Sequence, residues 1–187
     1  MKPRSIRPSH RYTGVAIALH WLMALMIAGN LAVGLTMARM PLSPTRLLLY
    51  NGHKWTGALV LALAALRLLW RLRHQPPMLP PMAPWQHVAA RLSHAALYLL
   101  FFAVPLLGWA YSSAAGFPLV LFGLLPLPDW VPVDRALAQA LKPWHGRLAW
   151  LLGGLVLLHI AAAAKHQLVD RDGLTNRMLP ARAAHTD

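Results

Sequence analysis

The chain has 187 residues, of which 57% are hydrophobic and only 12% are charged. This excludes an ordinary soluble domain, in which about a quarter of the residues carry charge. Cysteine is absent, which excludes disulfides, thiolate metal sites, cysteine-held iron–sulfur clusters and haem attached through a C-x-x-C-H motif. The net charge is +13 and glutamate is absent; in so apolar a chain, basic loops that face anionic lipid explain this charge better than nucleic-acid binding does.

Four segments of the chain are long and apolar enough to cross a membrane as helices. They cover about residues 15–37, 52–70, 92–113 and 144–164. We therefore predict an all-α fold, an integral membrane four-helix bundle that forms a single domain over residues 1–187. No small-residue cleavage pattern stands at a sensible distance after the basic N-terminal residues, so we expect the first segment to be retained as a helix.

Lysine and arginine are unevenly shared between the two sides of the predicted bundle. The side with both termini holds eleven of them and the other side six, so the positive-inside rule places both termini in the cytoplasm. The eleven are Lys2, Arg4, Arg7, Arg11, Arg71, Arg73, Arg91, Lys165, Arg171, Arg177 and Arg182, and the six are Arg39, Arg46, Lys54, Arg135, Lys142 and Arg147.

Two connections between the predicted spans have a distinctive composition. The segment from His74 to Pro84 is rich in proline, which predicts a semi-extended loop without helix. The segment from Ala114 to Lys142 contains the apolar run FPLVLFGLLPLP. This run is too short to span a membrane and is broken by prolines, so we expect it to lie at the interface on the side opposite the termini.

Five histidines fall inside or at the mouth of a predicted span, where ionisable side chains are costly and are functional candidates. His145 and His159 are 14 residues apart in the fourth span, so a helix presents both within about 40° on one face and roughly 21 Å apart. The direction of each span sorts the others by depth. His20 and His94 share the inner half with His159, whereas His53 shares the outer half with His145.

This sorting gives an outer pair, His53 with His145, and an inner pair, His20 with His159. A porphyrin iron between bundle helices needs one imidazole on either side, so we predict that these four residues are the metal ligands of two haems. A zinc site would instead need three or four ligands at one level, and a lone histidine in a span is often only hydrogen-bonded to a neighbouring helix. His94 is left over as a competing inner ligand, a partner of a propionate or part of a quinone site.

Three basic residues are further candidates. Arg67 follows His53 by 14 residues and should reach the inner level, where it either meets a haem propionate or extends to the nearby membrane surface. Lys54 and Arg147 flank the outer histidines. They either form a positive mouth that steers a small anion or contact lipid headgroups.

Several stretches form a set with the histidine positions: R-Y-T-G from Arg11, H-W-L-M from His20, N-G-H-K-W-T-G from Asn51, H-A-A-L-Y-L-L-F-F-A-V-P-L-L-G-W from His94, K-P-W-H-G from Lys142, H-I-A-A-A-A-K-H from His159 and D-G-L-T-N-R-M-L-P from Asp172. This set resembles the bacterial cytochrome b561 family of four-helix, two-haem membrane proteins. The likeness covers nearly the whole chain, and no ligand position departs from it.

The resemblance implies that His20 and His159 ligate a cytoplasmic-side haem b and that His53 and His145 ligate a periplasmic-side haem b, in a multi-pass protein of the bacterial inner membrane. Some members look like superoxide oxidases that deliver electrons to ubiquinone. Others are similar to the cytochrome b subunits of hydrogenases and formate dehydrogenases, whose protein partner supplies electrons.

Our leading hypothesis is therefore a di-haem oxidoreductase that takes electrons from superoxide, or from another small one-electron donor, and reduces ubiquinone in the membrane. The first rival is a cytochrome b anchor that passes electrons between a partner dehydrogenase or hydrogenase and quinone. The second rival is a non-redox transporter or structural bundle.

Overall fold

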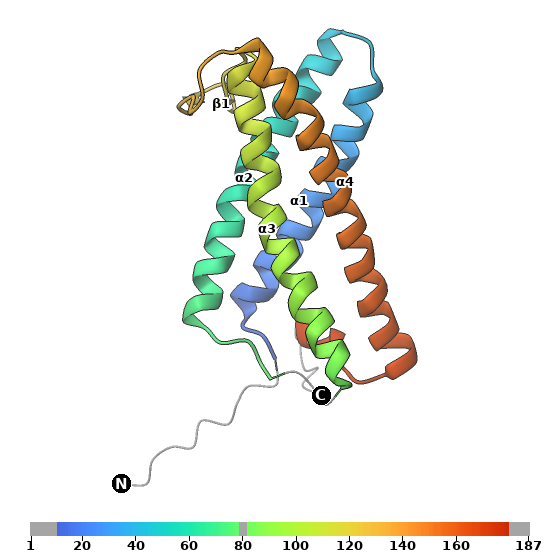
Figure 1. Ribbon diagram of the computed structural model, residues 1–187. Helices are drawn as coiled ribbons and strands as arrows, with labels where there is room; N and C mark the ends of the chain where they lie inside the picture. Colours follow the sequence, from blue (N-terminus) through green and yellow to red (C-terminus); the bar gives the residue numbers. More distant parts are fainter. Residues whose placement is uncertain (1–10, 79–81, 180–187) are drawn as a thin grey trace, which may run out of the picture.

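The computed structural model describes residues 11–78 and 82–179, which fold into four long helices of alternating direction (Figure 1). The helices are α1 (Gly14–Arg39), α2 (Pro44–Arg73), α3 (Pro84–Ala114) and α4 (Arg135–Lys165). Each is long and apolar enough to cross a membrane, so the predicted four-helix membrane bundle is confirmed. We call the end with the start of α1 and the end of α4 the termini end, and the opposite end the loop end.

Local sequence signals set the starts of these helices. Side-chain oxygens of Thr13, Ser43 and Asp134 accept hydrogen bonds from first-turn amides of α1, α2 and α4, which otherwise have no partner inside the helix. Pro44 and Pro84 stand in the first turn of α2 and α3, where the missing N–H of proline costs nothing.

The helices extend beyond the predicted spans, most clearly at the start of α4. This helix begins at Arg135 rather than near Trp144, because its polar first turns and Pro143 resemble a loop in the sequence. The cap at Asp134 stabilises the early start. The helix continues through Pro143, its ninth residue, although a proline there removes one intrahelical hydrogen bond and crowds the carbonyl four residues earlier. In the same way, α3 begins at Pro84 rather than near Leu92.

The connection between α3 and α4 folds back on α2 at the loop end. It contains a small antiparallel hairpin of β1 (Val120–Leu121) and β2 (Leu125–Pro126). The turn needs two left-handed residues, Phe122 with φ 53° and Gly123 with φ 73°. Trp55 on α2 holds the hairpin, since its Nε1 donates to the Val120 carbonyl at 2.7 Å. The position of this apolar segment at the membrane interface stays a prediction.

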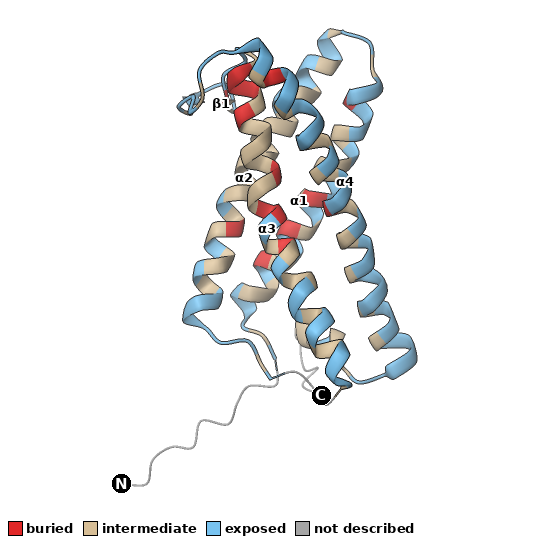
Figure 2. Ribbon diagram, in the orientation of Figure 1, coloured by how far each residue is buried: buried red, intermediate tan, exposed pale blue. Residues whose placement is uncertain are grey.

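A buried apolar cluster lies in the middle of the bundle, and further buried residues lie at the loop end near β1 (Figure 2). Leu152 is buried on α4 midway between His145 and His159, and Val60 is buried on α2 seven residues after His53. They belong to one apolar cluster with members from all four helices: Met23, Ile27, Val60, Ala64, Leu97, Leu100, Phe101, Val104 and Leu152. This cluster, which we call the central layer, lies between the two histidine levels.

Large apolar side chains also cover the outside of the bundle. Leu25, Leu72, Leu99 and Leu157 are each exposed by about two thirds or more, at 72%, 72%, 67% and 69%. A helix that is apolar on its outer face as well as its inner face would not be stable in water. This surface fits the hydrocarbon of a bilayer.

The chain beyond α4 folds back across the termini end through a π-helical turn (His166–Asp170) and a 3₁₀ turn (Thr175–Met178). Nε1 of Trp21 donates to the carbonyl of Met178 at 2.8 Å, and the guanidinium of Arg11 donates to that of Leu179 at 2.6 Å. Both ends of the described chain therefore meet at one end of the bundle, as four spans require. The compartment that this end faces stays a prediction, and Lys2, Arg4, Arg7 and Arg182 of the charge count lie outside the described residues.

Candidate functional site

His53 of α2 and His145 of α4 face each other on the loop-end side of the central layer. Their ring centroids are 6.1 Å apart and the rings are almost perpendicular, at 88°. Nδ1 of His53 lies 3.2 Å from the carbonyl oxygen of Asn30, and Nδ1 of His145 lies 3.0 Å from that of Val104. Because a carbonyl only accepts, each Nδ1 carries the proton in these hydrogen bonds, and each Nε2 keeps a free lone pair for a metal.

Two glycines make room for these imidazoles. A Cβ atom on Gly34 would lie 3.1 Å from Cε1 of His53, and a Cβ atom on Gly108 would lie 2.9 Å from Cε1 of His145. The backbones of α1 and α3 thus press against the two rings and limit how they can turn. Sequence reasoning missed both residues, because each is far from its histidine along the chain; the one signal is a glycine inside an apolar span, which needs a packing reason.

His20 of α1 and His159 of α4 face each other on the termini-end side of the central layer. Their ring centroids are 6.2 Å apart, at an angle of 67°. His94 of α3 faces the same partner, with its ring centroid 5.5 Å from that of His159. Nδ1 of His20 is buried and has no hydrogen-bond partner among the described residues. The structure thus brings the three inner histidines together, and both His20 and His94 face His159.

Both predicted pairs have the spacing of two imidazoles that share one metal. A metal–imidazole bond is about 2.0 Å long and the ring centre lies about 1 Å behind the nitrogen, so two such rings on opposite sides of a metal have centroids about 6 Å apart. Zinc would need at least a third ligand that converges on the same point, and the ring nitrogens of His20, His94 and His159 do not converge in this way. Within residues 11–78 and 82–179, the one group of three close metal-binding side chains lies elsewhere, at the end of α4: His166, Asp170 and Asp172. The residues present fit a bis-histidine haem iron.

Arg67 lies half-buried on α2 at the inner level. Its guanidinium carbon is 5.9 Å from the ring centroid of Tyr98 on α3, and both side chains line a pocket that also includes His94. Arg67 and His94 therefore line one pocket beside the inner histidine pair. They come from α2 and α3, whereas the pair comes from α1 and α4. Their roles toward a propionate or a quinone stay predictions.

Lys54 and Arg147 lie at the loop end, each held by a different partner. Nζ of Lys54 donates to the carbonyl of Pro118 at 3.1 Å, and the guanidinium carbon of Arg147 is 5.0 Å from the ring centroid of Trp144. The structure does not bring the two cations into one contact. Lys54 directly follows His53 on α2, and Arg147 follows His145 by two residues on α4.

A family model described as prokaryotic cytochrome b561 matches residues 11–181 of the chain. The chain belongs to this family. Cytochrome b561 homolog 2 of Escherichia coli (strain K12) is 35% identical over 178 residues, which cover 90% of this chain and 91% of that protein. Cytochrome b561 homolog 1 of the same organism is 32% identical over 181 residues, covering 92% and 99%. The probable superoxide oxidase CybB of Yersinia pestis is 31% identical over 173 residues, covering 91% and 96%.

This prokaryotic cytochrome b561 is therefore a multi-pass electron-transfer protein of the bacterial inner membrane, with the oxidoreductase character and the b-type haem of its family. The resemblance that the motifs indicated is confirmed. The paired histidines fit the haem because each pair offers imidazoles from two helices at the spacing that an iron requires.

Proposed function

We propose that this cytochrome b561 binds two haem b groups, one between His53 and His145 and one between His20 and His159. The proposal is carried by the two histidine pairs, whose ring centroids are 6.1 and 6.2 Å apart on opposite sides of the central layer. Haem b supplies reversible one-electron exchange when bound. Each pair would hold its haem with two imidazoles and would leave no position for oxygen to bind, which suits one-electron transfer.

The residues around the pairs would hold and tune the haems. The carbonyls of Asn30 and Val104 fix the tautomer of the outer imidazoles, and such hydrogen bonds make an imidazole a more basic ligand. At the inner level, Arg67 and His94 would offer a cation and a hydrogen-bond donor to the propionates.

We further propose that superoxide is the electron donor at the loop end and that ubiquinone is the acceptor in the membrane. Two superoxide ions each lose one electron and become O₂, and ubiquinone takes up two electrons and two protons to become ubiquinol. A relative with 31% identity is named a probable superoxide oxidase. By the positive-inside rule, the loop end faces the periplasm.

Basic side chains at the loop end support a small anionic donor. Lys54 and Arg147 flank the outer histidines, and a cavity of about 430 Å³ between α3 and α4 is lined by Arg135 and Lys142. The loop end carries an excess of positive charge, six lysines and arginines against Asp129 and Asp134, and such an excess raises the local concentration of an anion and speeds its association. This region would collect superoxide close to the outer pair.

The purified protein, reconstituted with ubiquinone and supplied with enzymatically generated superoxide, tests both proposals. We expect two non-covalent b haems per chain in the reduced-minus-oxidised spectrum, and ubiquinol formation that added superoxide dismutase abolishes. One haem or none would contradict the cofactor assignment. Two haems without superoxide-dependent ubiquinol formation, together with co-purification of a dehydrogenase or hydrogenase, would instead assign the protein as an anchor for that partner.

A further inference from the structure

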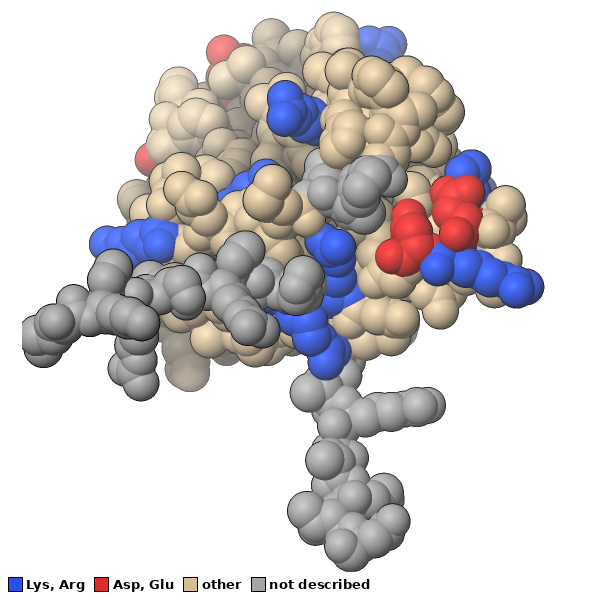
Figure 3. Space-filling view, turned by 90° about the horizontal axis from the view of Figure 1, so that it is seen from below, with Lys and Arg blue, Asp and Glu red and all other residues tan. Residues whose placement is uncertain are grey.

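A pocket of about 610 Å³ lies at the termini end, between the start of α1, the end of α2 and the start of α3. Figure 3 looks onto this end of the molecule, where basic side chains gather over the middle. Six basic side chains line the pocket: Arg11, Arg67, Arg71, His74, Arg91 and His94.

Two of these arginines are crowded on one helix. Arg67 and Arg71 are four residues apart on α2, and their guanidinium carbons lie 5.9 and 5.7 Å from the centroid of the same ring, that of Tyr98. Like charges at this spacing destabilise a helix, and a half-buried cation within a membrane span is costly without a counter-charge. The arrangement therefore calls for an anion.

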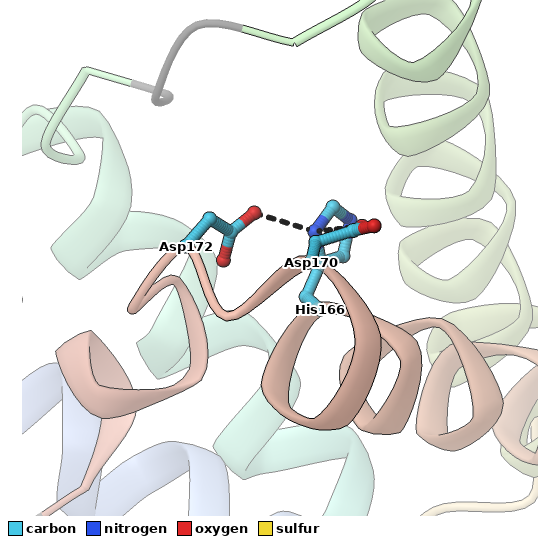
Figure 4. A group of neighbouring side chains, drawn as sticks. All are labelled: His166, Asp170 and Asp172. Carbon is cyan, nitrogen blue, oxygen red and sulfur yellow. Dashed lines mark hydrogen bonds and ion pairs between the residues drawn. The ribbon is translucent and has the colours of Figure 1, made fainter.

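The carboxylates of the described chain lie away from the pocket. Asp129 and Asp134 are at the loop end, where they accept from Ser113 and from the first amides of α4. Asp170 pairs with Lys165 at 2.6 Å, and both Asp170 and Asp172 point toward His166 (Figure 4). The fifth, Asp187, lies outside the described residues. No described carboxylate lines the pocket, so an anion bound there would supply a counter-charge to Arg67 and Arg71.

We propose that this pocket binds the phosphate headgroup of an anionic phospholipid. Planar guanidinium groups hold phosphate oxygens by paired hydrogen bonds, and basic pockets between membrane helices bind the headgroups of such lipids. Trp70 lines the pocket and donates from Nε1 to Oγ1 of Thr13 at 2.9 Å, and tryptophan is enriched at membrane–water interfaces. Leu68 and Ala95 in the wall suit the glycerol and the first acyl carbons.

The arginines of the pocket lie at different depths. A lipid phosphate and a haem propionate would therefore contact different arginines, and substitutions can tell the two anions apart. Arg67 is half-buried, whereas Arg71 and Arg91 are exposed at the rim. A lipid headgroup that enters from the membrane surface contacts the rim first. A propionate of an inner haem would instead reach the deep Arg67. Substitution of the two rim arginines therefore tests the lipid.

The test compares Arg71→Gln/Arg91→Gln with the matched control Arg73→Gln/Arg171→Gln. Both double variants remove two positive charges from the termini end, but Arg73 and Arg171 do not line the pocket. Native mass spectrometry of the haem-loaded protein measures binding of phosphatidylglycerol and of phosphatidylcholine with the same acyl chains. We expect the wild type and the control to prefer phosphatidylglycerol. The rim variant should bind this lipid at least about tenfold more weakly, with an unchanged haem content.

Several results would overturn this proposal. Equal phosphatidylglycerol binding by the rim and control variants would show that only overall charge matters. Inorganic phosphate that competes as well as the lipid at the same concentration would assign the site to a soluble anion. Loss of one haem from the rim variant with unchanged lipid binding would assign it to a propionate. If the double variant does not fold in detergent, the single variant Arg91→Gln, on an exposed residue near the start of α3, is compared with Arg73→Gln.

Discussion

His53 and His145 are held by all four helices at once. The imidazoles come from α2 and α4, and their Nδ1 atoms hydrogen-bond the carbonyls of Asn30 on α1 at 3.2 Å and of Val104 on α3 at 3.0 Å. Imidazoles fixed in this way would be oriented before a metal binds. The inner level differs, because Nδ1 of His20 has no partner among the described residues.

Removal of one α4 histidine should remove one haem. We expect His145→Ala to lose the outer haem and His159→Ala the inner one, because each variant lacks one of the two imidazoles that would hold that haem, while the other pair stays intact. Haem quantification and the reduced-minus-oxidised spectrum measure this loss. His87→Ala, at the start of α3, is the control and should keep both haems. Two haems with unchanged spectra in both α4 variants would refute the ligand assignment.

The glycine beside His145 should be intolerant of a methyl group. In Gly108→Ala the new Cβ would lie 2.9 Å from Cε1 of His145, so the ring must shift, at a cost of about 1–3 kcal/mol in stability. We expect a changed or lost outer-haem signal, measured by absorption and electron paramagnetic resonance, and a normal inner haem. Gly154→Ala on α4 has no atom within 4 Å of its Cβ and should leave both signals unchanged. An unaltered outer haem in Gly108→Ala would argue against the tight fit.

The two histidines opposite His159 can be told apart by substitution. If His20 is the inner ligand, as we propose, His20→Ala loses the low-spin signal of the inner haem and His94→Ala retains it. In His94→Ala the change should instead appear in the reduction potential or in the rate of ubiquinone reduction. The reverse pattern would assign the ligand to His94, whose ring lies 5.5 Å from that of His159.

Reversal of charge at the loop end should slow the reaction with superoxide. For Arg147→Glu, and for Lys54→Glu, we expect a lower rate at low salt and a smaller difference at high salt, because added ions screen the attraction. Stopped-flow haem reduction at several salt concentrations measures this dependence. Arg39→Glu, at the end of α1, is the control for overall charge. Equal effects in all three variants would remove the case for local steering.

Acid should loosen the segment that follows α4. Partial burial acts to raise the pKa of Asp172, but hydrogen bonds from the Leu174 amide and from His166 outweigh it and hold this pKa below its usual value. The ionised carboxylate therefore adds stability at and above the usual pKa of about 3.9, and this stability is lost as the pH falls through the lowered pKa. Hydrogen-exchange protection of Leu174 should drop over this range in the wild type, whereas Asp172→Asn should show low protection throughout.

The sequence predicts the spans and the histidine levels because both depend on local properties. Apolar runs of sufficient length identify the helices, and the 14-residue spacing of His145 and His159 sets their common face. The early start of α4 is hidden by Pro143 and by polar first turns. The contacts of Gly34 and Gly108 with the outer imidazoles depend on helix packing, which a spacing pattern does not contain. The docking of Met178 against Trp21 also joins residues that are far apart in the chain.

The central layer has a consequence for protons. Its nine buried residues, from Met23 to Leu152, carry no titratable side chain, so none of them can pass a proton from one histidine level to the other. If the two haems bind as proposed, charge would cross the layer between the two histidine levels as electrons and not as protons. Electron flow from one level to the other would itself move charge through the membrane field.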